Sequence, residues 1–302
     1  MNQPWLKYKL MPVAFKSHYL DSGSFSLMVN AKRYAKANNC DPMLYYDTAE
    51  FWQYVDDYCK FVTKYRAAID DHSVMDVIPN AERTWKCQQY MEDYGLNPVP
   101  VVHYGTDLKW LKKYMDRGHK FIAIGVMGKH GQVECRNWLD KVFQMVSDPD
   151  GFPVVKLHGF AITRWELLVR FPWWSVDSAS WLKIGAFGGV MLPHKRKGEF
   201  VFTEPPHIVK CAHESPERKK AGGHLLTMSP MEQSVFYEWL EKINIPLGKM
   251  NYIGEIKKIG VINDHSSRLT ANLIYFEELA KHVPKWPWAF RSTHRKGFGI
   301  AL

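Results

Sequence analysis

Short apolar runs alternate with longer amphipathic runs along the middle of the chain. Apolar runs bounded by turn residues favour strands, whereas apolar positions that recur every three to four residues favour helices. The pattern predicts strands at 73–78, 99–104, 121–127 and 154–162, and the end of a further strand at 175–177. It predicts helices at 81–94, 107–117, 132–146 and 164–170. Helices between successive strands indicate a parallel sheet, because each strand must cross back before the next one starts.

The repeated strand–helix units predict an α/β protein. We expect a (β/α)8 TIM-type barrel with irregular C-terminal insertions, formed as a single domain over residues 1–302. In such a barrel the functional residues lie at the carboxyl ends of the strands, on one face. The candidates at or near predicted strand ends are Asp21, Asp76, His103, Gly125, His158 and Asp177.

The pattern changes after about residue 192, where turn residues and cations gather. The segments 194–198 and 216–223 are expected to be exposed loops. Ser229 followed by Glu232 is a capping signal for a helix, and 264–282 predicts a final helix. We expect this part of the chain to form a nucleic-acid-binding face through the cations of the two loops, Lys195, Arg196, Lys197, Arg218, Lys219 and Lys220.

Composition adds a bias towards a nucleic-acid partner. The chain has a formal net charge of +9 and is 14% aromatic, with 12 Trp. Cations attract phosphates and aromatic rings stack on bases, although a merely basic enzyme fits the charge equally well. The five Cys include no CxxC pair, and no run of 18 apolar residues occurs. We therefore expect no disulfide framework, signal peptide or membrane span, and a cytoplasmic location (the host cytoplasm if the protein is phage-encoded).

Two acidic motifs carry the candidate chemistry, at 19–25 (YLDSGSF) and at 173–181 (WWSVDSASW). Each sets one Asp between bulky apolar residues and small flexible ones. Paired carboxylates support double displacement at a sugar carbon, with one as nucleophile and the other as acid/base. Only a closed fold could bring Asp21 and Asp177 together.

The first motif resembles the Asp-Ser-Gly-Gly-Phe motif of the tRNA-guanine transglycosylases. Residues 154–181, which contain HGFAIT and VDS, resemble the strand, helix and nucleophile segment of that family. The two segments together are still more similar to the phage and bacterial relatives that insert 7-deazaguanine bases into DNA. The order of motifs matches over about residues 15–195.

The resemblance implies a role for each acidic motif. Asp177 would be the nucleophile that attacks C1′ of the target guanosine, and Asp21 the general acid/base for the leaving and incoming bases. Ser22 and Gly23 would supply the turn and a close backbone approach. The structural alternatives are a capping or salt-bridged Asp177 and an Asx-turn Asp21.

Further residues match the base-binding positions of the family more loosely. Asp76 would read the Watson–Crick edge of a guanine-like base, and His103 would be a base-binding side chain or a structural histidine. Gly125 would contact the base through its backbone or form a plain turn. His158 and Gly159 would touch the ribose or flank the nucleophile.

Arg268 and Asn272 are one helical turn apart, a spacing that suits a phosphate site or, more simply, the capping of a barrel helix. The chain also departs from the tRNA enzymes, whose zinc site resembles a CxCxxC run with a later His. Here Cys211 and His213 form the only close Cys/His pair, so we expect no metal; a Cys211, His213 and His224 site is the alternative.

We therefore expect a base-exchange transglycosylase that replaces guanine in DNA with a 7-deazaguanine derivative (preQ0-like). The target base would be flipped out, with Trp173, Trp174 and Trp181 walling it. No cofactor is expected, and a homodimer remains open. The alternatives are the same exchange on tRNA, a non-catalytic nucleic-acid-binding barrel subunit, and a glycoside hydrolase, which the basic charge disfavours.

Overall fold

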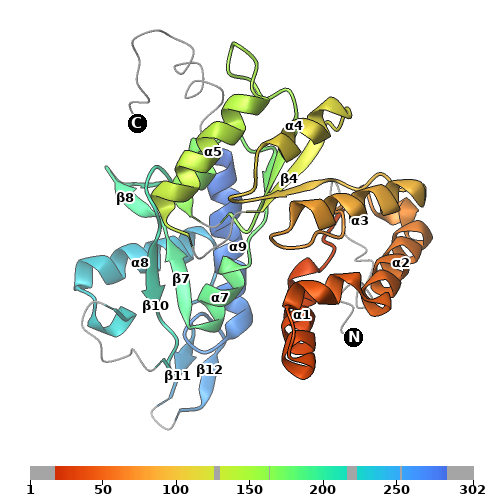
Figure 1. Cartoon of the computed structure of the whole chain (residues 1–302). Coiled ribbons are helices and arrows are strands. Elements are labelled where there is room, and N and C mark those ends of the chain that lie inside the picture. Colours follow the sequence, from red (N-terminus) through yellow and green to blue (C-terminus); the bar gives the residue numbers. More distant parts are fainter. Residues whose placement is uncertain (1–17, 126–129, 163, 216–222, 252–253, 284–302) are drawn as a thin grey trace. The chain divides into compact units, whose positions relative to one another are not determined.

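The computed structural model describes residues 18–125, 130–162, 164–215, 223–251 and 254–283. It is a mixed α/β protein with a parallel sheet (Figure 1). The described residues divide into two compact units. Unit 1 holds residues up to 161 together with 172–176, and unit 2 holds 162–171 and the residues from 177 onwards. The prediction that all 302 residues form one barrel domain stays a prediction.

Unit 1 contains parallel strands that neighbour one another in sequence order. They are β1 (Tyr19–Leu20), β2 (Asp71–His72), β3 (Val101–His103), β4 (Phe121–Gly125), β5 (Lys156–Phe160) and β6 (Ser175–Val176). β1 pairs with β2, and β3 to β6 form a four-stranded sheet. A parallel bridge between Ser73 and Val99 joins the two pieces, and Val99 N–H donates to His72 O at 2.8 Å. The prediction of a parallel sheet is confirmed.

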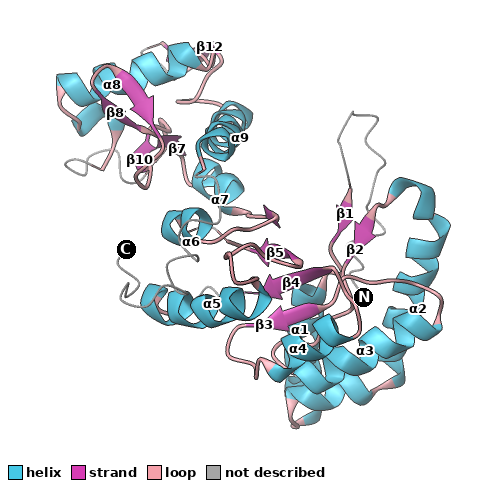
Figure 2. Cartoon of the chain, turned by 90° about the horizontal axis from the view of Figure 1, so that it is seen from above, coloured by secondary structure: helices cyan, strands magenta, loops and turns pink. Residues whose placement is uncertain are grey.

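The helices of unit 1 lie between these strands in the chain. They are α1 (Ser24–Asn38), η2 (Pro42–Asp47), α2 (Ala49–Lys64), η3 (Arg66–Ala68), α3 (Ala81–Asp93), α4 (Lys109–Asp116) and α5 (Gln132–Val146). Figure 2 shows β3, β4 and β5 side by side, with α3, α4 and α5 next to them. Asn80 caps α3 by accepting a hydrogen bond from Arg83 N–H at 2.9 Å. The predicted helices at 81–94, 107–117 and 132–146 are confirmed.

The sheet of unit 1 is strongly curved. The ring of Tyr19 on β1 stacks on His158 of β5, with centroids 4.8 Å apart, and meets Phe121 of β4 edge-on at 5.9 Å. In a flat sheet, strands four positions apart would be separated by roughly 19 Å. The contact therefore requires the strands to curl around a shared inner face.

The predicted strand at 73–78 is wrong beyond Ser73. β2 ends at His72, and Val74 N–H still donates to Val99 O at 2.9 Å, but the backbone N–H groups of residues 75–77 bond to side chains instead of a neighbouring strand. Asp76 N–H donates to Ser24 Oγ at 3.2 Å, and Val77 N–H donates to Thr84 Oγ1 at 2.9 Å. The apolar run resembles a strand because the segment is buried.

Unit 2 has its own core. Its helices are α6 (Trp165–Arg170), α7 (Ser180–Ala186), η4 (Leu225–Thr227), α8 (Pro230–Lys242) and α9 (His265–His282). Its strands are β7 (Gly189–Leu192), β8 (His194–Arg196), β9 (Glu199–Val201), β10 (His207–Lys210), β11 (Lys249–Met250) and β12 (Ile256–Lys258), which pair antiparallel as β7–β10, β8–β9 and β11–β12. Ser229 caps α8 in a capping box with Glu232, as predicted. No helix in the described ranges is long and apolar enough to cross a membrane.

Arg268 and Asn272 anchor α9 within unit 2. Arg268 donates to Gly185 O at 2.9 Å and to Val261 O at 2.8 Å. The side chain of Asn272 accepts from Met191 N–H at 2.7 Å and donates to two backbone carbonyls at 3.2 Å. Both side chains therefore bind backbone groups of unit 2, and a phosphate site at this pair stays a prediction.

The predicted exposed loop at 194–198 is a β-hairpin instead. β8 and β9 pair directly, and Lys197 and Gly198 form the two-residue turn with φ of 51° and 89°. Two successive positive φ angles match the twist of the flanking strands. Lys-Gly lacks the Asn or Asp that usually marks such a turn, so the sequence shows only a cationic segment. The second predicted loop falls largely on 216–222, outside the described residues.

Candidate functional site

The candidate site of unit 1 centres on a buried carboxylate at the carboxyl ends of β2 and β3. Asp76 Oδ2 lies 2.7 Å from His103 Nε2. Its other oxygen, Oδ1, accepts from Ser24 Oγ at 2.5 Å and from Ser22 Oγ at 3.2 Å. All four side chains are buried. The structure therefore brings together Asp76, His103 and Ser22, which the sequence predicted separately.

Local geometry explains how the first motif reaches Asp76. Gly23 precedes α1 in the left-handed region, with φ of 77° and ψ of 22°. Residues with a Cβ rarely adopt this conformation, so glycine permits the sharp turn. The turn directs Ser22 and Ser24 to the same carboxylate, with their hydroxyls 2.8 Å apart.

The surroundings of Asp76 keep it ionised. Burial alone would raise the pKa of the carboxyl, but the hydrogen bond and charge of His103, followed by the bond from Ser24, lower it below its usual value. A carboxylate with several donors in a dry site favours the charged form. At neutral pH the site therefore holds a fixed negative charge.

Occupancy of both carboxylate oxygens limits what Asp76 can do with a ligand. Each ionised oxygen can accept about two hydrogen bonds, so Oδ2 keeps one acceptor direction beyond His103. The residue is only 6% exposed. Its clearest role in the described structure is to position His103 and the 22–24 segment. Base reading by Asp76 stays a prediction.

Gly125, at the end of β4, makes room for His103. The two residues are register partners in the parallel ladder. A Cβ at Gly125 would lie 2.8 Å from Cδ2 of the His103 ring, too close for any real contact. Since His103 is pinned by Asp76, any side chain at 125 would displace it. Base contact by the backbone of Gly125 stays a prediction.

A second polar group lies on the inner face around His158. Its Nδ1 is 2.8 Å from Ser175 Oγ on β6, and its ring stacks on Tyr19. The hydroxyl of Tyr19 is 2.9 Å from Ser73 Oγ. Burial raises the pKa of the Tyr19 phenol well above its usual value, although the bond to Ser73 lowers it in part. Tyr19 therefore stays neutral, packs against His158 through its ring and forms a hydrogen bond with Ser73 through its hydroxyl.

Gly159 is the neighbour of His158 on β5 and pairs with Val176 of β6. The ladder therefore links the predicted ribose-contacting pair to the strand that immediately precedes Asp177. Contact of His158 or Gly159 with a ribose stays a prediction.

The two predicted catalytic carboxylates directly follow strands. Asp21 follows β1, is exposed, and accepts from Gly23 N–H at 3.3 Å. This is the Asx-turn geometry that served as the alternative. Asp177 follows β6, is exposed, and is the first residue of the second segment of unit 2.

Of the candidate tryptophans, Trp173 is partly buried and Trp174 is exposed. Trp173 meets the buried Phe143 edge-on, with ring centroids 5.0 Å apart, as core packing requires. Trp174 is 62% exposed, and Lys156 Nζ lies 3.9 Å from its ring centroid. Trp181 belongs to α7, and its carbonyl accepts from Asn272. Of Trp173 and Trp174, Trp174 is therefore the residue whose ring is exposed enough to meet a stacking partner.

The basic residues predicted to grip phosphate are partly neutralised within unit 2. Lys195 forms an ion pair with Glu238, and Arg196 binds both oxygens of Glu204 at 2.9 Å. Lys197 occupies the hairpin turn. The other three, Arg218, Lys219 and Lys220, lie outside the described residues.

The residues of the alternative zinc site have other partners. The thiol of Cys211 is buried and donates to Val261 O at 3.6 Å. His224 Nδ1 accepts from Leu226 N–H at 3.2 Å, and Nε2 lies 3.2 Å from Ala212 O. Within the part of the chain that the structure describes, no group of three or more His, Cys, Asp or Glu is arranged to hold a metal ion.

Sequence reasoning missed Ser24, whose hydroxyl makes the shortest contact to Asp76. A signal was present, because Ser24 stands at the one position where 21–25 departs from Asp-Ser-Gly-Gly-Phe. Tyr19, Ser73 and Ser175 were also missed, since their pairings join strands far apart in the chain. No family model, no curated protein and no solved structure matches this chain.

Proposed function

We propose that the protein is a base-exchange transglycosylase that replaces guanine in DNA with a 7-deazaguanine derivative. The observation that carries the proposal is the link between the first motif and the neighbouring strand ends. Ser22 and Ser24 bind Asp76, which binds His103, so three segments of unit 1 converge on one buried anion. Functional sites of parallel α/β folds lie at this edge of the strands.

The finer fold that we propose is the (β/α)8 barrel. Two features of unit 1 support it. Strands β1 to β6 are parallel and follow sequence order, and the stacking of Tyr19 on His158 shows strong curvature. A barrel of this class is an eightfold repeat of the same unit.

In the proposed reaction the Asp177 carboxylate attacks C1′ of the target nucleotide. The C1′–N9 bond of guanine breaks, and Asp21 donates the proton that the leaving base takes up. The incoming 7-deazaguanine then loses its N9 proton to Asp21 and attacks C1′, which breaks the ester and frees Asp177. Two displacements retain the configuration at C1′. One glycosidic bond replaces another, so the exchange balances without a further reactant.

The buried cluster would act beside this chemistry. Asp76 would hold His103 at the base-binding edge and, through the one acceptor direction left on Oδ2, accept from one donor of a guanine-like base, N1–H or N2–H. The backbone of Gly125 would border the same base. The exposed ring of Trp174 suits a stacking partner, because base–aromatic stacking tolerates any base.

Mass spectrometry of nucleosides tests the function. DNA and tRNA are incubated separately with the protein and a 7-deazaguanine base, then digested. We expect the modified deoxynucleoside in the DNA digest and none with Asp177→Asn, which keeps the size of the side chain and removes the nucleophile. A modified ribonucleoside in the tRNA digest alone would replace DNA with tRNA as the substrate.

The covalent step has a separate readout. Denaturing gels with labelled DNA should show a slow-migrating adduct with the parent protein and with Asp21→Asn, but not with Asp177→Asn. Asp21→Asn should slow turnover by roughly 10²–10⁴ if it acts as the general acid/base. Full turnover by Asp177→Asn would disprove the nucleophile assignment. Binding without any exchange on either polynucleotide would point to a non-catalytic subunit.

A further inference from the structure

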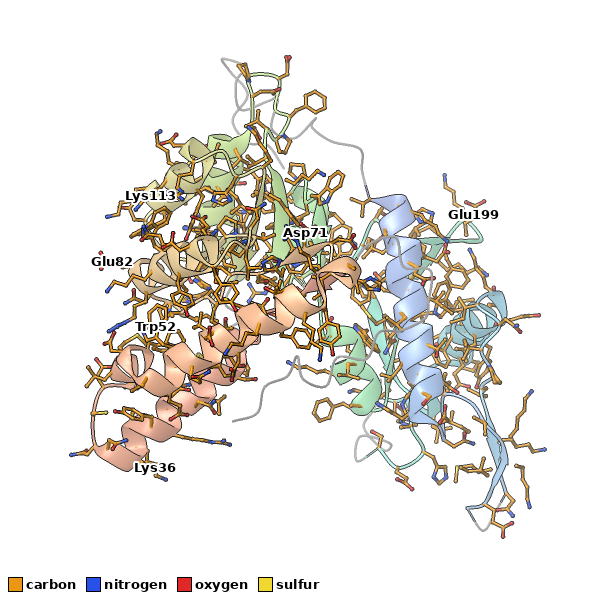
Figure 3. The ribbon with its side chains drawn as sticks, turned by 90° about the vertical axis from the view of Figure 1, so that its right-hand side faces the viewer. Lys36, Trp52, Asp71, Glu82, Lys113 and Glu199 are labelled. Carbon is orange, nitrogen blue, oxygen red and sulfur yellow. The ribbon has the colours of Figure 1, made fainter. Side chains whose placement is uncertain are left out.

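The β11–β12 ribbon of unit 2 is exposed to an unusual extent. Every residue from 254 to 259 is exposed, including Ile256 at 53% and Ile259 at 63%. Figures 1 and 3 both show the ribbon extending away from the body of unit 2. A two-stranded ribbon is only marginally stable alone in water, so an exposed ribbon must be stabilised by contacts where it joins the rest of the unit.

The base of the ribbon is firmly held. Asn263 accepts from Gly260 N–H at 3.0 Å and donates to Lys258 O at 2.9 Å. A Cβ at Gly260 would lie 2.3 Å from both Gly248 N and Pro246 O, so the two ends of the ribbon approach as closely as backbone allows. α9 begins at His265, two residues after Asn263. The two ends of the ribbon are therefore held by contacts within unit 2, next to the start of α9.

Like charges face each other across the ribbon. Lys249 of β11 lies directly opposite Lys258 of β12. Such a pair destabilises a ladder, since like charges oppose each other at short range. Within the described ranges, neither lysine has a carboxylate within 4 Å; Glu255, the acidic residue of the ribbon, binds Lys257 at 3.0 Å and Asn251 at 2.9 Å. The repulsion would be relieved by an anion bound between the two ammonium groups.

We propose that this ribbon binds the phosphate backbone of a duplex polynucleotide. Two features of the ribbon match that partner. An antiparallel two-stranded ribbon fits the major groove of B-DNA, and Lys249 and Lys258, which have no carboxylate partner in the described ranges, carry positive charge that attracts phosphates. The ion-paired Lys195 and Arg196 have no such free charge. The identification of the duplex as DNA rests on the proposed function, whereas the ribbon's phosphate binding stands on its own geometry.

The test is the salt dependence of binding to a labelled duplex of about 20 base pairs, followed by fluorescence anisotropy between about 50 and 200 mM salt. Each lysine–phosphate contact contributes about 0.9 to the slope of log K against log salt. The double variant Lys249→Ala/Lys258→Ala should lower the slope by about 1.8, equally for unrelated sequences. The matched control is Lys112→Ala/Lys281→Ala, which removes two exposed lysines that are ion-paired within their own helices and should leave the slope unchanged.

Three outcomes would overturn the inference. The first is an unchanged slope in the ribbon variant, and the second is an equal fall of the slope in both double variants. The third is a ribbon variant that loses binding to anionic phospholipid vesicles but binds the duplex as the parent protein does. Circular dichroism of both variants checks that they fold, and we expect them to fold because the substituted lysines are exposed. Nucleoside exchange is measured in parallel: a parent protein that exchanges no base but shows the slope change refutes the proposed function alone.

Discussion

The buried cluster around Asp76 allows one prediction to be worked through in magnitude. Asp76→Asn keeps the size of the side chain but removes its charge. The carboxylate takes part in three side-chain hydrogen bonds, to Ser22, Ser24 and His103. Hydrogen bonds to a charged group contribute about 2 kcal/mol each and neutral ones about 1 kcal/mol, so the substitution loses about 3 kcal/mol at most. Relief from burying a charge returns part of this, and we expect a net loss of about 2 kcal/mol.

Hydrogen exchange with mass spectrometry suits the measurement, because it reports the opening free energy of each segment separately. Peptides from β3 and β4 should lose about 2 kcal/mol of protection at pH 7, whereas peptides from β7 and α9 in unit 2 should change by less than about 0.5 kcal/mol. Asp116→Asn is the control, since its exposed ion pair with Lys112 contributes little. A change below about 0.5 kcal/mol in β3 and β4 would refute the account of the cluster.

The same cluster predicts a pH dependence with a definite sign. The folded-state pKa of Asp76 is lowered, so its stabilisation is fully present above the unfolded value of about 3.9. It is lost as the pH falls through the lower folded-state pKa. Parent and Asp76→Asn should therefore differ most at neutral pH and converge in acid, which urea unfolding at each pH would show.

Further predictions concern other sites in the chain. Gly125→Ala should displace the pinned ring of His103 and abolish base exchange, with a smaller effect on polynucleotide binding; normal exchange would show that the ring can move freely. Native protein should show one fast-reacting thiol, at Cys40, and five after unfolding, because the other four are buried and burial raises the pKa of Cys59 and of Cys211 to about 12. More than one fast thiol would contradict this. Burial, with a smaller effect of Arg66, lowers the pKa of His72 to about 4. Acidification from about pH 6.5 to 4 then protonates mainly the unfolded chain and should cost up to about 1.4 kcal/mol per pH unit, a slope that His72→Gln should reduce in urea unfolding.

Local patterns predicted the elements that local interactions decide. The helix at 132–146 begins and ends where the periodicity predicted, and Ser229 caps α8 through Glu232. The prediction for the segment after Ser73 was wrong because burial produces an apolar run in a loop as well as in a strand. The backbone N–H groups of Asp76 and Val77 are satisfied by the side chains of Ser24 and Thr84, which no local pattern can indicate.

The candidate site shows the same division. Strand ends indicated Asp76 and His103 one by one, but their direct contact depends on the pairing of β3 with its neighbours. The acidic residue next to the basic segment 194–198 in sequence is Glu199, yet Lys195 and Arg196 pair with Glu238 and Glu204, which lie further along the chain. Charge in a sequence shows where cations are and leaves open which of them are neutralised. The lysine pair of the ribbon emerged only from the register of β11 and β12.

The path of the chain between the two units has a consequence for dividing the protein into fragments. The backbone leaves unit 1 after Ala161, returns for 172–176, and leaves again at Asp177. A fragment that stops at 161 would therefore lack β6 and leave β5 as an open edge with unpaired amide groups, the kind of edge that recruits strands from other chains. A fragment that starts at 177 would lose α6, whose Trp165 donates to Phe202 O at 3.1 Å. Neither half can be isolated by a single truncation, and complementation by two co-expressed fragments would need both to carry the 162–176 stretch.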